Sequence, residues 1–311
     1  MSNLRTKKKL LIVGGTGFIG YHLALGALKK NWSVTSISTN KPKKIRNLNK
    51  VKYIHCDIRR PKTLKKIIKK DFDYVVNLGG YVNHDDKKKT MDSHFTGCKN
   101  LTDIFREKKI YSFVQLGSSV EYGSSSSPQK ESKKINHQSL KSTYGKAKLL
   151  SSNYLINLFK RKNFPVTILR LYLAYGPRQD LNRLIPIVID SCLKNKKFSC
   201  SPGLQMRDFV YIDDVINAIF LSIKSKKSKG QIINIGSGKP KKIKRIIELI
   251  KKTLKKGKPQ YGKIKLRKDE ILKIYSNAQK SKKILNWVPR ININNGLKKT
   301  INYYKKLYDA R

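Results

Sequence analysis

A short apolar run that ends in closely spaced glycines sets the strongest limit on the fold of this chain. Residues 10–13 are continuously apolar, glycines follow at 14, 15, 17 and 20, and an apolar helical pattern extends from Phe18 to about Leu28. A continuous apolar run before a glycine turn is typical of a strand that is buried on both faces. We therefore expect a parallel sheet whose first unit is this strand, turn and helix.

The spacing of these glycines also indicates what the turn could bind. Gly15-x-Gly17-x-x-Gly20 matches the dinucleotide-binding pattern, and Gly14-x-x-Gly17-x-x-Gly20 matches a close variant of it. Glycine permits a tight turn and a close approach of the backbone, and the unpaired N–H groups at the start of the helix attract a pyrophosphate. The alternative is a tight strand–helix turn that binds no ligand.

The rest of the chain repeats strand and helix signals in alternation as far as residue 171. We expect strands at 10–13, 32–38, 51–58, 74–80, 113–117 and 167–171, with helices at 18–28, 61–70, 91–108 and 140–162. This alternation predicts an α/β fold, a Rossmann-type doubly wound parallel sheet. Beyond Tyr175 the alternation fades, so we expect an NAD(P)-binding domain over residues 1–175 and a smaller mixed α/β substrate-binding lobe over residues 176–311, with a crossing back to the sheet near 207–240.

The residues after the expected strands bear on the choice of dinucleotide. A site for NAD usually has an acidic residue near the end of the second strand, where it holds the ribose 2′-hydroxyl. Residues 38–44 include Asn40 and several cations but no acid, which favours NADP over NAD. Asp57 ends the third strand, where it could bind an adenine amino group or cap the next helix, and Gly79 ends the fourth, where it permits close ligand approach.

Tyr144 and Lys148 are the candidate pair for acid–base chemistry. They are four residues apart in a helical pattern and so share one face. A free tyrosine has a pKa of about 10, and one ammonium at ~4 Å contributes about 4 kcal/mol at an effective dielectric constant of about 20. We therefore expect Lys148 to lower the pKa of Tyr144; the alternative is an exposed pair with no role. Ser118, at the end of the fifth strand, could bind a substrate oxygen, but chemistry alone does not distinguish it from Ser119.

The charge of the chain is strongly positive. The formal net charge is +51, from 70 Lys and Arg against 19 Asp and Glu. Such an excess suggests nucleic acid as a partner, but the lysines are spread along the chain without a basic block interleaved with aromatic residues. We interpret most of this charge as solvated surface that can steer an anionic substrate.

Other classes of protein and site are disfavoured by the sequence. No apolar run approaches the length that spans a bilayer, and the basic N-terminus lacks the apolar stretch of a secretory signal. The five histidines are scattered, and the cysteines lack paired spacing, so we expect no metal site. Free, mostly buried thiols at Cys56, Cys98, Cys192 and Cys200 fit a reducing cytoplasm.

Several motifs, in order along the chain, resemble the extended short-chain dehydrogenase/reductase family, in its NAD(P)-dependent epimerase/dehydratase branch. They are Gly14-Gly15-Thr16-Gly17-Phe18-Ile19-Gly20, Asp57-Ile58, Ser118-Ser119-Val120-Glu121-Tyr122-Gly123, Tyr144 with Lys148, Tyr175-Gly176-Pro177, Arg207-Asp208-Phe209-Val210-Tyr211-Ile212-Asp213-Asp214 and Asn234-Ile235-Gly236-Ser237-Gly238. The resemblance covers nearly the whole chain.

The resemblance implies a role for each matched residue. It makes Tyr144 the acid/base that exchanges a proton with a sugar oxygen, Lys148 the residue that lowers its pKa and holds the nicotinamide ribose, and Ser118 the catalytic serine. Arg207 matches an arginine that contacts the diphosphate of a nucleotide sugar, and Arg267, in Leu266-Arg267-Lys268-Asp269, resembles a second one. The cofactor-binding residues that we expect are Gly14, Thr16, Gly17, Phe18, Ile19, Gly20, Asn40, Asp57, Ile58, Gly79 and Lys148.

One departure from the family pattern narrows the reaction. Sugar 4,6-dehydratases of this branch carry an Asp-Glu pair just after the catalytic Ser or Thr, where this chain has Ser119 and Val120. Residues 117–123 resemble reductases that make deoxyhexoses for surface polysaccharide, such as abequose-synthase-like enzymes. We therefore expect NADP-dependent reduction of the C4 ketone of a nucleotide-linked 4-keto-6-deoxyhexose.

Two alternatives stay open. One is a 4-epimerase, which returns its hydride and keeps a tightly bound NAD. The other is a non-catalytic RNA-binding relative that uses the basic surface. For a reductase and for an epimerase alike, the resemblance implies a homodimer formed through the helices at 91–108 and 140–162.

Overall fold

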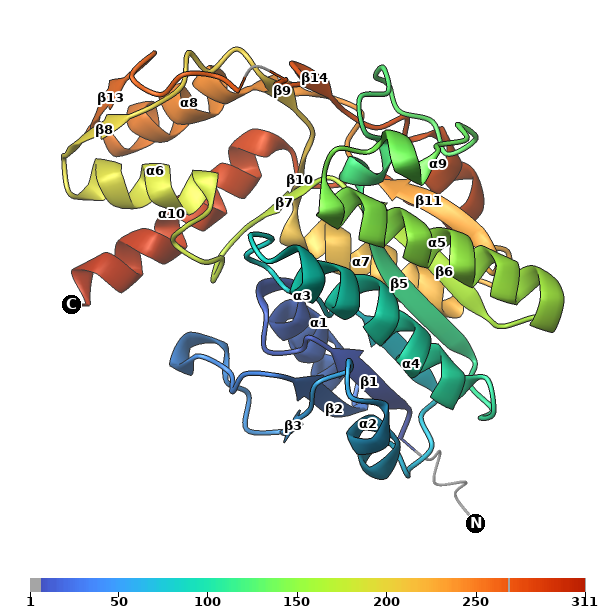
Figure 1. The fold of residues 1–311 in the computed structure, drawn as a ribbon. Helices are drawn as coiled ribbons and strands as arrows, with labels where there is room; N and C mark the ends of the chain where they lie inside the picture. The colour runs from blue at the N-terminus through green and yellow to red at the C-terminus, as the bar shows by residue number, and fades with distance from the viewer. Residues whose placement is uncertain (1–6, 268, 311) are drawn as a thin grey trace.

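A seven-stranded parallel sheet forms the centre of the computed structural model, which describes residues 7–267 and 269–310. The strands are β1 (Lys9–Val13), β2 (Ser33–Ser38), β3 (Val51–His55), β4 (Tyr74–Asn77), β5 (Ser112–Ser118), β6 (Val166–Leu171) and β11 (Gln231–Ile235). Their order is β11-β6-β5-β4-β1-β2-β3 (Figure 1). The predicted Rossmann-type fold is confirmed. Because the order reverses between β1 and β4, the carboxyl ends of the strands form the ligand edge.

Helices cover both faces of this sheet (Figure 1). On one face lie α1 (Phe18–Lys29) and α7 (Ile212–Lys224), and on the other lie α2 (Pro61–Ile67), α4 (Gly97–Phe105) and α5 (Thr143–Lys162). The side chains of β1 alternate between the two faces. Leu10 and Ile12 belong to the core on the α1 side, and Leu11 and Val13 belong to the core on the α4 side. The apolar run is therefore buried on both faces, as its sequence predicts.

The helix predicted over residues 91–108 is shorter and irregular. α3 (Lys87–Met91) leads into one π-helical turn, η2 (Asp92–Thr96), and α4 begins at Gly97. Within η2 the carbonyl of His94 accepts a hydrogen bond from Ser151 Oγ of α5 at 2.7 Å. This contact ties the irregular turn to the helix that carries Tyr144. The sequence did not predict it because a π turn adds a residue to the helical period.

The chain after Tyr175 forms a smaller mixed lobe above the ligand edge (Figure 1). Its helices are α6 (Leu184–Leu193), α8 (Ile243–Leu254) and α10 (Ile293–Asp309). Its short strands form three small sheets, β10-β7, β12-β9-β14 and β13-β8. They are β7 (Leu173–Tyr175), β8 (Lys197–Ser199), β9 (Met206–Arg207), β10 (Phe209–Tyr211), β12 (Lys241–Lys242), β13 (Lys258–Gln260) and β14 (Lys273–Ile274).

Part of the second half returns to the main sheet. α7 packs under the sheet, β11 pairs with β6 in parallel, and α9 (Gln279–Leu285) lies beside β11. Short 3₁₀ turns complete the chain at η1 (Lys44–Arg46), η3 (Ser119–Tyr122) and η4 (His137–Ser139). The second half of the chain therefore contributes α7, β11 and α9 to the part of the structure that surrounds the main sheet.

Two sets of contacts hold the lobe over the sheet. In the loop after β7, Pro177 O lies 2.9 Å from His22 Nε2 of α1, and Asp180 forms ion pairs with Lys43, at 2.6 Å, and with the buried Arg46. The second set centres on Asp208, whose buried carboxylate accepts hydrogen bonds from backbone amides at the end of β11 and before α9. Those amides belong to Ser237, at 2.7 Å, Gly238, at 3.0 Å, and Ser276, at 3.1 Å. These contacts hold the lobe against the carboxyl edge of the sheet.

Candidate active site

The loop between β1 and α1 is a close-packed backbone cradle. Gly14 has a φ of +79°, which glycine adopts readily, and its N–H donates to Ile37 O of β2 at 2.8 Å. A Cβ on Gly20 would lie 2.4 Å from Gly14 O and 2.5 Å from Gly15 Cα. The loop can therefore close in this way only with glycine at position 20.

The start of α1 fits the pyrophosphate of a nicotinamide dinucleotide. Its N-cap is Gly17, no side chain caps the helix, and no acidic residue lies in its first turn. The first amides, at Phe18 and Ile19, thus lack a capping side chain, and the positive end of the helix dipole faces the loop. These amides, with the glycines of the loop, would hold the phosphate groups.

Further cofactor candidates lie along the same edge of the sheet. The Thr16 amide is 3.5 Å from Ser38 Oγ, so the loop is braced against the end of β2. Asn40 follows β2 and is exposed. The segment from residue 38 to residue 44 is therefore accessible where the sequence places the adenosine ribose.

Asp57 and Ile58 follow β3 and differ in what they contact. The Asp57 carboxylate accepts hydrogen bonds from Arg59, at 2.9 Å from the backbone N–H and 2.6 Å from Nη2, and this side-chain pairing lowers the pKa of Asp57. The N-cap of α2 is Arg60, so Asp57 is not the helix cap that the sequence left as an alternative. The Ile58 side chain packs beside Gly79, where an added Cβ would lie 2.8 Å from Val13 Cγ1.

We expect Gly20→Ala to weaken dinucleotide binding more than tenfold. The new methyl group would collide with backbone atoms of Gly14 and Gly15, and relieving such overpacking typically costs about 1–3 kcal/mol. Titration of the protein with NADPH or NADH, followed by cofactor fluorescence, measures the change. Gly262→Ala is the matched control, because an added Cβ there meets nothing within 4 Å, although its φ of +80° carries some strain. Equal affinities for the Gly20→Ala variant and the unmodified protein would contradict the assigned loop.

Ser118, Tyr144 and Lys148 meet at the carboxyl end of β5. Ser118 is the last residue of β5, and Tyr144 and Lys148 lie one turn apart near the start of α5. The Ser118 side chain lies near enough to Tyr144 to lower the pKa of the phenol, and Lys148 Nζ is 5.9 Å from the centre of the Tyr144 ring. Lys148 is buried, and its Nζ donates to Leu116 O of β5 at 2.7 Å. The three side chains that the sequence singles out therefore face one space.

The electrostatics of this group differ from the expectation for Tyr144. Burial raises the pKa of Tyr144 to about 12, against lowering effects of the Ser118 hydrogen bond and the charge of Arg183. Burial also lowers the pKa of Lys148 to about 8, and the charge of Glu121 opposes this change. The pKa of Tyr144 is therefore raised and not lowered as the sequence predicts, because burial of the phenol dominates, and Lys148 Nζ donates to Leu116 O.

Two histidines that the sequence treats as scattered lie against Tyr144. The His84 ring stacks on the Tyr144 ring with centroids 4.0 Å apart and planes at 16°, and His94 meets it edge-on at 4.9 Å. Burial lowers the pKa of His94 to about 2, so its ring is neutral. A Cβ on Gly80 would overlap this ring, so the glycine makes room for it. Only the fold brings these positions together; the sequence gives no spacing signal for them.

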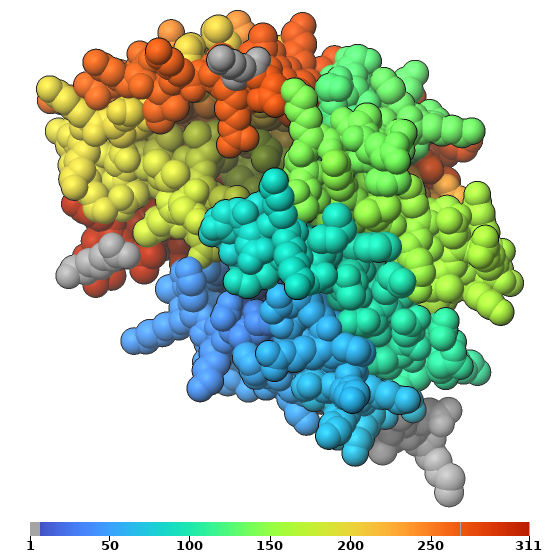
Figure 2. All heavy atoms as spheres, viewed as in Figure 1, coloured from blue at the N-terminus to red at the C-terminus, as the bar shows by residue number. Residues whose placement is uncertain are grey.

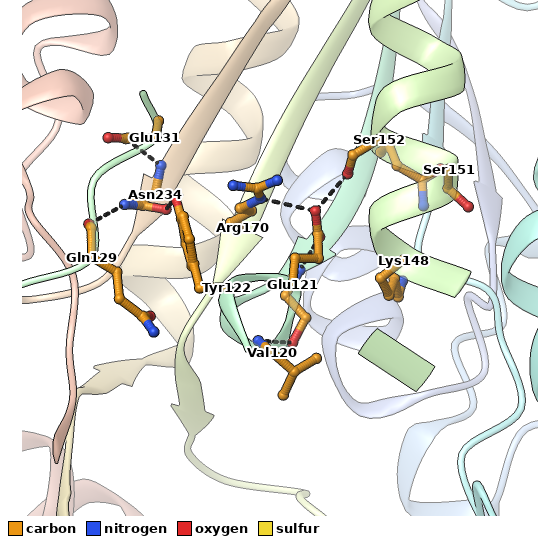
Figure 3. A network of polar contacts seen from close by, with 12 residues as sticks. Val120, Glu121, Tyr122, Gln129, Glu131, Lys148, Ser151, Ser152, Arg170 and Asn234 are labelled. Carbon is orange, nitrogen blue, oxygen red and sulfur yellow. Dashed lines mark hydrogen bonds and ion pairs between the residues drawn. The ribbon is translucent and has the colours of Figure 1, made fainter. Parts of the chain in front are cut away.

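A buried polar network surrounds Glu121 and Arg170 (Figure 3). Glu121 and Arg170 form an ion pair with Arg170 Nε 2.8 Å from Glu121 Oε2, and their side chains are 0% and 3% exposed. The same oxygen accepts a hydrogen bond from Ser152 Oγ at 2.7 Å, and Oε1 accepts one from the Ser118 amide at 2.8 Å. The sequence motif contains Glu121, but nothing in it reveals the partner on β6.

A cavity of about 400 Å³ in the lobe has Arg267, but not Arg207, in its lining. Arg267 lines this cavity together with Glu270, and Glu270 is the ion-pair partner of Arg207. Arg207 Nη1 also donates to Ile271 O at 2.8 Å. Figure 2 shows the surface hollowed where the yellow and orange segments of the lobe face the green segment. Lys268, which completes the motif around Arg267, lies outside the described residues.

The features that the sequence disfavours can be compared with the described part of the chain. Among residues 7–267 and 269–310, no three His, Cys, Asp or Glu side chains are grouped so that they could hold a metal ion. In the same residues, no helix has both the length and the apolar character needed to cross a bilayer. All four cysteines are free and buried.

Comparisons with known proteins agree with this geometry. Residues 10–236 match the sequence model of the NAD dependent epimerase/dehydratase family. The chain is 29% identical to UDP-glucuronate 4-epimerase of Thermodesulfobacterium geofontis, over 95% of this chain and 96% of that protein. It is 25% identical to CDP-abequose synthase of Salmonella muenchen, over 96% of this chain and 99% of that protein.

A solved structure shares the whole fold. UDP-glucuronic acid 4-epimerase from Bacillus cereus, determined in complex with UDP-glucuronic acid and NAD, superposes with a TM-score of 0.86 at 26% identity. The match covers 96% of this chain and 100% of that one. The family match, the glycine cradle and the Ser118–Tyr144–Lys148 group lead to one conclusion: this chain belongs to the NAD-dependent epimerase/dehydratase family, within the extended short-chain dehydrogenases/reductases.

Proposed function

We propose that this enzyme transfers hydride at C4 of a nucleotide-linked hexose, and that its physiological direction is reduction of the C4 ketone of a 4-keto-6-deoxyhexose for surface polysaccharide. The observation that carries the proposal is the meeting of Ser118, Tyr144 and Lys148 at the carboxyl end of β5, on the edge that bears the glycine loop. A bound nicotinamide supplies the hydride. The protein residues supply the proton and the orientation of the ketone.

Tyr144 donates the proton to the ketone oxygen in this proposal. Because burial raises the pKa of Tyr144 to about 12, the phenol is protonated at neutral pH and ready to act as an acid. Ser118, near Tyr144 at the end of β5, orients the ketone oxygen as a second donor. Lys148 stabilises the phenolate left after proton transfer and holds the nicotinamide ribose. Arg267, which lines the cavity, and Arg207, which is paired with Glu270 of the same cavity, bind the diphosphate.

The absence of an acidic pair directly after Ser118 favours reduction over water elimination. Ser119 and Val120 stand where dehydratases of the branch have their acidic pair. Glu121, the next residue, is fully buried and held by Arg170, so its carboxylate is engaged behind the site. Similarity to CDP-abequose synthase also supports a reductase.

We propose NADP as the preferred cofactor, because the segment after β2 lacks an acid for the ribose 2′-hydroxyl. In this segment Lys43 and Arg46 are paired with Asp180, whereas Lys41 and Lys44 are exposed.

Neutralisation of Asp180 should therefore free two further cations, Lys43 and Arg46. We expect Asp180→Asn to lower the Kd of NADPH about tenfold and to leave that of NADH nearly unchanged, since one charge-assisted hydrogen bond contributes about 1.5–3 kcal/mol. Parallel fluorescence titrations with both cofactors measure the ratio, and a larger gain for NADH contradicts the assignment.

A 4-epimerase is the second candidate. The similarity to UDP-glucuronate 4-epimerase of Thermodesulfobacterium geofontis and to the NAD-bound epimerase of Bacillus cereus favours it. An epimerase returns its hydride within one turnover, so the purified protein would carry NAD and need none added. For either enzyme we propose a cytoplasmic homodimer that pairs through α4 and α5, and no nucleic-acid partner.

The deciding experiment is a panel of nucleotide sugars. The protein is mixed with CDP- and dTDP-linked 4-keto-6-deoxyglucose, UDP-glucose and UDP-glucuronate, each with NADPH or NADH, and cofactor absorbance is followed. We expect NADPH consumption with the 4-keto sugars alone. Interconversion of a UDP-sugar and its C4 epimer without cofactor consumption identifies the epimerase, and turnover of no nucleotide sugar contradicts both candidates.

A further inference from the structure

We propose that Glu121 is a positioning residue of this active site, which holds Ser118 through its backbone amide and acts as the buried counter-charge of Lys148. The inference rests on the roles proposed above for Ser118 and Lys148. It goes beyond them because it assigns to the Glu121–Arg170 pair a part in the reaction in addition to its part in the core.

The contacts of the Glu121 carboxylate join three elements at the site. Oε1 accepts the Ser118 N–H at 2.8 Å, which fixes the end of β5 where it turns into η3. Oε2 accepts hydrogen bonds from Ser152 Oγ of α5, at 2.7 Å, and from Arg170 Nε of β6, at 2.8 Å. The side chain thereby links the strand of Ser118 with the helix of Tyr144. A shift of Glu121 therefore moves Ser118 relative to the phenol.

The backbone near Glu121 leaves space for this close approach. A Cβ on Gly117 would lie 2.5 Å from Glu121 Oε1 and 3.2 Å from Arg170 Cγ. Any larger residue at 117 would displace the carboxylate. On its other side, the guanidinium of Arg170 lies 4.5 Å from the centre of the Tyr122 ring. Gly117 on one side and Tyr122 on the other therefore restrict the positions that the Glu121–Arg170 ion pair can adopt.

Figure 3 shows the carboxylate between Arg170 on one side and the α5 residues Ser152 and Lys148 on the other. The charge of Glu121 raises the pKa of both Lys148 and Tyr144. The other charged or titratable groups that face Lys148 and Tyr144 are Cys98 of α4, His84 before α3, His94 of η2 and Arg183 at the start of α6. Among these groups Glu121 is the carboxylate, so it opposes the loss of the Lys148 proton that burial favours.

The sign of the expected effect follows from these charges. Without the carboxylate, the buried ammonium of Lys148 loses its counter-charge while the Arg170 charge becomes unbalanced. Both changes disfavour the protonated form of Lys148, so its pKa should fall. A nearby opposite charge favours the charged form of a titratable group, so we expect a measurable fall in the pKa of Lys148.

The test measures the Lys148 side chain directly. Protein labelled with carbon-13 in lysine is titrated by NMR, and the Lys148 methylene signal is assigned by its loss in Lys148→Met. The titration is done for the unmodified chain, Glu121→Gln and Glu131→Gln. Glu121→Gln keeps an oxygen that can accept the Ser118 N–H bond and removes the charge. Glu131→Gln is the matched control, because Glu131 Oε1 binds the Asn234 amide at 2.8 Å in the outer part of the same network (Figure 3).

We expect the pKa of Lys148 to fall in Glu121→Gln and to stay in place in Glu131→Gln. An unchanged pKa in Glu121→Gln, or an equal fall in both variants, overturns the proposal. The NMR titration needs no substrate or cofactor, so its result does not depend on the outcome of the nucleotide-sugar assay. If Glu121→Gln does not fold, Glu121→Gln/Arg170→Gln replaces it. This pair removes both buried charges, and the Lys148 pKa should still fall, though by less than in Glu121→Gln, because the counter-charge is lost while the opposing Arg170 charge is lost too.

Glu121→Asp separates positioning from charge. Aspartate keeps the charge and the pairing with Arg170, but it is one methylene too short to reach the Ser118 amide as well. We expect a Lys148 pKa close to that of the unmodified chain, a fall in kcat of more than tenfold with CDP-linked 4-keto-6-deoxyglucose and NADPH, and little change in KM. An unchanged kcat in Glu121→Asp contradicts the positioning of Ser118.

Discussion

Replacement of Tyr144 by phenylalanine is expected to lower kcat about 10³-fold, within the range of about 10²–10⁴ that general acid–base catalysis contributes. The phenol lies near Ser118 and one helical turn from Lys148, and the substitution removes this proposed proton donor. The ring remains, and with it the stacking against His84 at 4.0 Å and the edge contact with His94 at 4.9 Å. The variant should therefore fold normally and bind NADPH with nearly unchanged affinity.

The matched control for this variant is Tyr154→Phe on the same helix. The Tyr154 hydroxyl is 3.3 Å from Thr102 Oγ1 of α4, away from the proposed site, and its loss should leave kcat within about twofold. Initial rates of cofactor consumption and fluorescence titrations compare the two variants. A Tyr144→Phe enzyme with near-normal kcat contradicts the role given to the phenol.

Arg170→Met is expected to lower the free energy of unfolding by about 3–5 kcal/mol, the usual effect of removing one partner of a buried ion pair. Glu121 would stay behind as a fully buried carboxylate held by Ser118 and Ser152 alone. The variant also loses the packing of the guanidinium on Tyr122. Urea unfolding followed by circular dichroism measures the loss.

Two further variants serve as comparisons for Arg170→Met. Arg161→Met, at the exposed end of α5, should change the free energy of unfolding by no more than about 0.5 kcal/mol. Glu121→Gln/Arg170→Met removes both charges and should regain most of the stability, because neutral replacements for a buried pair are often tolerated. A loss below about 1 kcal/mol in Arg170→Met contradicts a tightly packed pair.

Local sequence signals were sufficient where one segment determines its own structure. The apolar run of β1 is buried on both faces, and the glycines after it are required by backbone contacts within the loop itself. The helices predicted over residues 18–28 and 140–162 are found as α1 and α5, with ends that differ by at most three residues. The family and the fold followed from such local motifs taken in order.

The parts that were missed depend on pairings between distant segments. Arg170 meets Glu121 across 49 positions of the sequence, and His84 meets Tyr144 from a different element. The sequence also gives no measure of burial, which decides the pKa of Tyr144 against the expected effect of Lys148. Likewise, the pairing of Lys43 and Arg46 with Asp180 depends on the position of the lobe over η1.

Transfer of a deuterium label tests the central claim most directly. NADPH deuterated at the transferring position of the nicotinamide is mixed with CDP- or dTDP-linked 4-keto-6-deoxyglucose, and the product is analysed by NMR and mass spectrometry. We predict deuterium at C4 of the sugar with the unmodified enzyme and about 10³-fold slower labelling with Tyr144→Phe. Deuterium at another carbon, or equal labelling rates for the two proteins, would contradict proton transfer by Tyr144 during reduction at C4.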